Sequence, residues 1–60
     1  MYRVKYKVVN RDGHQLFTDV TVVTANSKFS ACVIVRQKNY KFDSSRKLKQ
    51  RAEILNCEPV

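Results

Sequence analysis

Sixty residues are enough for one small domain, residues 1–60, and a chain of this length buries only about 60% of the surface that its unfolded form exposes. It therefore has no room for a deep catalytic cleft, and its sequence contains no glycine-rich phosphate loop, no paired carboxylates and no nucleophile with a neighbouring base. We expect a protein that is not an enzyme. The net charge of +7 favours polyanionic partners.

The first two predicted elements are strands joined in a hairpin. Residues 2–9 alternate apolar and mostly cationic side chains, which is the period of a half-buried strand, and residues 15–24 are rich in Val and Thr. Between them, residues 11–13 are typical of a three-residue hairpin loop with Gly13 in the left-handed conformation.

This loop also predicts the register of the two strands. It pairs Asn10 with His14 and, further along, Val4 with Val20, because a shorter turn would bring lysines onto the core face. The predicted core face holds Tyr2, Val4, Tyr6, Val8 and Val20. The opposite, open face holds Arg3, Lys5, Lys7, Val9, Phe17, Thr21 and Val23.

The next segment is predicted to be a helix over residues 28–39. Ser27 or Asn26 can cap its N-terminus. Ala31 would face the sheet, and Cys32, Val35 and Ile34 can continue the same stripe. A strand is the alternative, because residues 33–35 are all β-branched and alternate residues from Phe29 onward are apolar.

The C-terminal third leaves two topologies open. Residues 54–57 are typical of a short closing strand, which gives the order ββαβ with a long basic loop over residues 40–50. Helical spacing over residues 48–55 gives βββα instead. We favour ββαβ because an early helix can cover the core face. Either order is an α+β fold, a three-stranded antiparallel sheet with one helix packed on one face.

A basic segment begins in the last turn of the predicted helix and continues beyond it. Seven of the twelve Lys and Arg residues lie within residues 36–51, and Asp43 is the only acid among them. Such a segment is expected to contact phosphates. Together with the cations of the open sheet face, the predicted nucleic-acid-binding residues are Arg3, Lys5, Lys7, Arg36, Lys38, Lys41, Arg46, Lys47, Lys49 and Arg51.

Four further side chains are candidates for contact with bases or with a protein partner. Phe17 and Val23 share the predicted open face, where an apolar pair suits a protein partner. Tyr40 and Phe42 lie in the basic segment, where they either stack on bases or anchor the loop to the core.

Metal ions, cofactors and membranes are not expected partners. Cys32 and Cys57 are expected to be reduced, half-buried thiols, and their spacing fits no metal motif. The longest apolar run, residues 31–35, is far shorter than the ~18 residues of a membrane span, and the N-terminus lacks the apolar stretch of a signal peptide. We therefore expect a cytoplasmic location.

Two segments together resemble a pattern found in many small proteins of phages and other mobile elements. They are Val20-x-Val22-x-x-Ala25-x-Ser27-x-x-x-Ala31 and Ile-Leu-x-Cys-Glu-Pro-Val at residues 54–60. The resemblance implies a non-enzymatic accessory or inhibitor protein.

The charge pattern makes nucleic-acid binding through phosphate contacts the leading hypothesis for function. One alternative is a phage-encoded or mobile-element-encoded inhibitor or adaptor that docks on an acidic surface of a host protein. Another is a structural homo-oligomer, such as a homodimer, formed by pairing of an exposed sheet edge.

Overall fold

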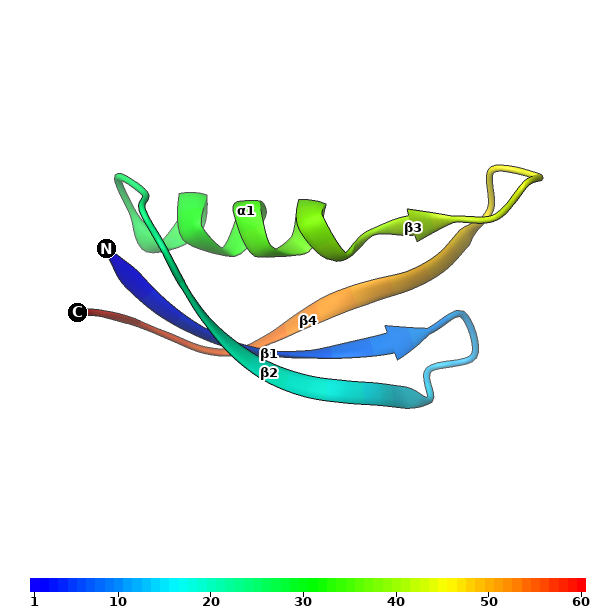
Figure 1. The fold of residues 1–60 in the computed structure, drawn as a ribbon, viewed down its shortest axis with the longest axis horizontal. Helices are drawn as coiled ribbons and strands as arrows, with labels where there is room; N and C mark the ends of the chain where they lie inside the picture. Colours follow the sequence, from blue (N-terminus) through cyan, green and yellow to red (C-terminus); the bar gives the residue numbers. More distant parts are fainter.

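The computed structural model describes all 60 residues, which form one helix and four strands. The elements in chain order are β1 (Tyr2–Asn10), β2 (Gln15–Val23), α1 (Lys28–Asn39), β3 (Lys41–Phe42) and β4 (Leu48–Pro59). The strands make one antiparallel sheet in the order β2-β1-β4-β3 (Figure 1).

The predicted α+β class with one helix is confirmed, and the βββα alternative is wrong because residues 28–39 are helical. The predicted number of strands is also wrong by one. Lys41 pairs with Gln50 and Phe42 with Leu48, so part of the expected long loop is the two-residue strand β3. Such a short pairing has almost no alternation by which a sequence pattern could reveal it.

Helix α1 begins at its predicted residue because Ser27 caps it. Ser27 has an extended backbone, and its hydroxyl oxygen accepts a hydrogen bond from the N–H of Ser30. The helix buries Ala31 and Val35 against the sheet. This packing outweighs the low helix propensity of the β-branched residues 33–35, since most helical stability in proteins comes from tertiary contacts.

The three-residue hairpin loop is confirmed. The N–H of Asn10 donates to the carbonyl oxygen of His14 at 2.9 Å, and Gly13 has a φ of 88°. The side-chain oxygen of Asn10 accepts from the N–H groups of Asp12 and His14, at 3.0 and 2.9 Å. Both a main-chain hydrogen bond and hydrogen bonds to the Asn10 side chain therefore stabilise the loop.

The predicted register of β1 and β2 is wrong beyond the loop. Val9 pairs with Gln15 as predicted, but a bulge then leaves Leu16 without an opposite residue, and Val8 pairs with Phe17. Val4 consequently faces Thr21 instead of Val20. A one-residue shift moves every later side chain of a strand to the other face.

This shift changes which valines form the core. Val23 is buried with an exposed fraction of 6%, whereas Val20 is 48% exposed. Val9, expected on the open face, is also buried, although it lies outside the main cluster. The main buried cluster consists of Val4, Tyr6, Val8, Val23, Ala31, Val35 and Ala52.

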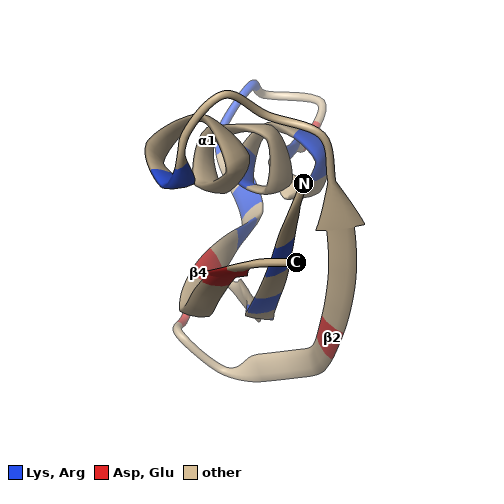
Figure 2. Cartoon of the chain, turned by 90° about the vertical axis from the view of Figure 1, so that its left-hand side faces the viewer, with Lys and Arg blue, Asp and Glu red and all other residues tan.

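The core lies between α1 and one face of a curled sheet. Seen from its end, the sheet curls from β4 through β1 to β2, and α1 lies over the open side of the curl (Figure 2). The molecule is elongated, with extents of 37 × 19 × 13 Å. The twelve-residue α1 lacks the length and apolar character needed to cross a membrane.

Candidate nucleic-acid interface

Two hairpin loops are joined at one end of the molecule. Arg11, in the β1–β2 loop, donates its backbone N–H to the carbonyl oxygen of Lys49 at 3.1 Å and its side-chain Nε to that of Leu48 at 3.2 Å. Its guanidinium also forms an ion pair with Asp43, at the start of the β3–β4 loop. The β3–β4 hairpin is thus fastened to the rest of the sheet.

Asp43 organises the β3–β4 loop from within. Its Oδ1 accepts hydrogen bonds from the hydroxyl of Ser45 at 2.7 Å and from the N–H groups of Ser45 and Lys47 at 2.9 and 3.0 Å. Hydrogen bonding holds the pKa of Asp43 well below its ordinary value of 3.8. The largest cause is the bond from the Ser45 hydroxyl, followed by those from the Lys47 N–H and from Arg11. The one acid of the basic segment is therefore engaged with these groups.

The ion pairs separate the cations of the protein into two groups. Four cations lie within 4 Å of a carboxylate: Arg3 beside Glu58, Lys7 and Arg51 both beside Glu53, and Arg11 beside Asp43. Eight of the twelve Lys and Arg residues have no such partner. Six of these eight, which we call the basic end, are Arg36, Lys38, Lys41, Arg46, Lys47 and Lys49.

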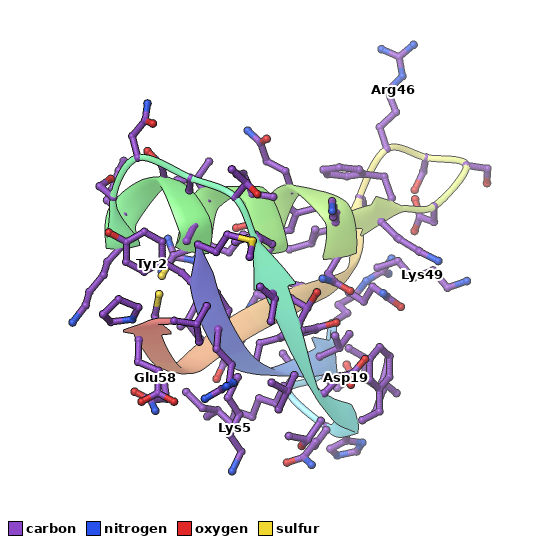
Figure 3. The ribbon with its side chains drawn as sticks, turned by 60° about the vertical axis from the view of Figure 1, so that its left-hand side comes forward. Tyr2, Lys5, Asp19, Arg46, Lys49 and Glu58 are labelled. Carbon is purple, nitrogen blue, oxygen red and sulfur yellow. The ribbon has the colours of Figure 1, made fainter.

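The basic end follows one continuous stretch of structure, from the last turn of α1 to the start of β4. Arg36 and Lys38 lie in the last turn of α1, which leads directly into β3. Arg46 and Lys49 extend away from the molecule at the β3–β4 hairpin (Figure 3). All six side chains are exposed. Arg46 has a φ of 64°, a conformation uncommon for a residue other than glycine.

The two aromatic residues of the basic segment are exposed. Phe42 has an exposed fraction of 62% and Tyr40 one of 40%. Of the two alternatives for these side chains, anchoring of the loop to the core therefore does not hold for Phe42. Exposed aromatic rings among unpaired cations are the combination that single-stranded nucleic acids bind.

The outer sheet face differs from the predicted open face. Arg3 and Lys7 lie on it, but each has a glutamate of β4 beside it, and only Lys5 is without a carboxylate partner. The predicted Phe17/Val23 patch does not exist, because Phe17 is 45% exposed while Val23 is in the core. The register shift at Leu16 is the physical reason.

Both cysteines occupy the half-buried positions predicted for them, Cys32 in α1 and Cys57 in β4. Cys57 pairs with Val4 in the sheet and packs against the core. Burial, with the neighbouring Cys32 thiol as a further cause, raises the pKa of Cys57 above its ordinary value of 9.0. At neutral pH Cys57 is therefore a protonated thiol.

Comparison with known proteins gave no match to a family model, to a curated protein or to a solved structure. The function of the chain is therefore inferred from its own charge, exposure and geometry.

Proposed function

We propose that the protein binds nucleic acid through the basic end, by contacts between its six cations and phosphate groups. The observation that supports this most is the absence of carboxylate partners for these cations, while most cations elsewhere have one. An exposed cation without a partner binds a phosphate without first breaking an ion pair. Each such contact releases counterions from the nucleic acid.

The exposed aromatic rings extend the proposal to unpaired bases. Phe42 and Tyr40 lie in the same segment as the cations, and stacking of a base on an aromatic ring tolerates any sequence. Phosphate contacts carry no sequence information either. We therefore propose binding with little base preference and a stronger affinity for single strands than phosphate contacts alone would give.

Fluorescence anisotropy with a labelled single strand and a labelled duplex, each titrated at several salt concentrations, tests this proposal. On the duplex, the logarithm of the association constant should fall with that of salt with a slope of about −4 to −5, because about five phosphates are neutralised. If no binding occurs below ~10 μM at low salt, where attraction is strongest, the proposal is wrong, and an acidic protein surface becomes the better candidate partner.

A pair of matched variants distinguishes binding through the basic end from binding that depends on net charge alone. R46Q/K47Q/K49Q removes three unpaired cations, and R3Q/K7Q/R51Q removes three that lie beside glutamates. Both variants have the same net charge. The first should lose about tenfold or more in affinity and flatten the salt slope, and the second should lose much less. Equal losses would show that binding follows net charge and not the basic end.

A further inference from the structure

Strand β2 is the only element of the fold without a Lys or Arg residue. Its nine residues contain a single charged side chain, Asp19. The chain as a whole carries a net charge of +7, so two copies repel each other over most of their surfaces. The surface of β2 is where a second copy meets no cation.

β2 is also an edge strand with little protection against pairing. It pairs with β1 on one side and with no strand on the other. Natural edge strands are protected by short length, charged side chains, Pro or bulges, as is β3, which has two residues and includes Lys41. β2 has no Lys or Pro, its bulge lies at Leu16 near its start, and Asp19 is its one charge. It exposes four apolar side chains to 45–51%: Leu16, Phe17, Val20 and Val22.

A two-fold axis at Val20 gives β2 a self-complementary antiparallel register. Val20 then faces Val20 of the second copy, Thr18 faces Val22, and Phe17 faces Val23. Asp19 faces Thr21, whose hydroxyl can donate to the carboxylate. An axis at Asp19 would instead place two carboxylates opposite each other, which is destabilising.

A backbone N–H group in the middle of this edge strand is already hydrogen-bonded to the side chain of Asp19. Its Oδ1 accepts a hydrogen bond from the N–H of Val20 at 2.8 Å. Pairing with a second strand exchanges this contact for a strand–strand hydrogen bond and frees the carboxylate for Thr21 of the second copy. The exchange keeps both polar groups satisfied.

We propose that two copies of this chain pair through β2 in the register centred on Val20, and so form a symmetric dimer with one continuous sheet. β2 starts beside the loop that contains Arg11, at the same end as the β3–β4 hairpin. Antiparallel pairing therefore directs the two basic ends away from each other, which lowers their repulsion. The dimer is independent of the proposed nucleic-acid binding.

Sedimentation equilibrium of the full chain without nucleic acid, from micromolar to millimolar concentration, tests the dimer. The unmodified protein should show a concentration-dependent dimer. V20K places two ammonium groups at the axis and should raise the dissociation constant at least about tenfold. The control L55K makes the same change in net charge at a residue of β4 that is 49% exposed, and should leave the dissociation constant unchanged. A protein that stays monomeric at millimolar concentration, or equal effects of the two variants, would overturn the proposal.

The register itself is tested by charge compensation. T18K should weaken the dimer, and T18K/V22E should restore it, because each introduced ammonium group then faces an introduced carboxylate of the second copy. Failure of the double variant to restore the dimer would overturn the register centred on Val20. Thr18 and Val22 are both exposed, so these variants keep the proposal testable even if V20K does not fold, which circular dichroism reports.

Discussion

Arg11 and Asp43 lie 32 positions apart in the chain, yet their ion pair joins the loop between β1 and β2 to the loop between β3 and β4. The contact lies at the end of the molecule from which the β3–β4 hairpin projects (Figure 1). The stability of the β3–β4 hairpin, which carries part of the basic end, therefore depends on a single carboxylate, and a substitution of Asp43 tests this dependence.

We expect D43N to lower the melting temperature and to reduce the dependence of stability on pH in acid. The pKa of Asp43 is depressed in the folded protein, so its contribution to stability is complete above its ordinary pKa of 3.8 and is lost as the pH falls below it. Thermal melts at neutral pH and below about pH 3 measure both effects. D12N is the control, because the Asp12 side chain makes no comparable hydrogen bonds; equal behaviour of the two variants would contradict the role of Asp43.

The observed register predicts opposite outcomes for the same substitution at two valines of β2. V23D should cost several kcal/mol, because it places an unpaired carboxylate in the core. V20D should be tolerated, since Val20 is exposed and lies opposite Lys5. Urea denaturation of the two variants gives both values. A larger loss for V20D would instead support the register without a bulge.

Loss of the exposed ring in the basic segment should weaken single-strand binding selectively. F42A should cost about 1–3 kcal/mol with a single strand and little with a duplex, because stacking needs an unpaired base. F29A is the matched control: Phe29 is even more exposed, at 75%, but lies in the first turn of α1, away from the basic end. Anisotropy titrations of both variants that show equal losses would exclude stacking on Phe42.

The Cys57 thiol should react slowly with iodoacetamide at neutral pH, and its rate should keep rising above pH 9, because its pKa is raised above 9.0. C32S removes the second thiol, one cause of this shift, and should make Cys57 react faster at a given pH. Mass spectrometry of the alkylated protein measures the rates. An unchanged rate in C32S would leave burial as the sole cause.

The local elements of this protein follow from short stretches of its sequence. The hairpin loop follows from the need for Gly13 at a positive φ, and the helix start follows from the capping hydroxyl of Ser27; both depend on neighbouring residues alone. The concentration of cations from the last turn of the helix onward is likewise visible in the composition of residues 36–51.

The faces of β2 and the pairing of the charges depend instead on how the strands pair in the folded chain. Val20, Thr21, Val22 and Val23 all suit a strand on either face, so the bulge at Leu16 was not predictable from their pattern. The glutamates of β4 lie beside Arg3 and Lys7 because β4 pairs with β1, a contact between the two ends of the chain. Three of the four ion-paired cations, Arg3, Lys7 and Arg11, thus meet a carboxylate that is distant in the sequence, and only Arg51 pairs with a near neighbour, Glu53. Which cations remain unpaired therefore depends largely on long-range strand pairing.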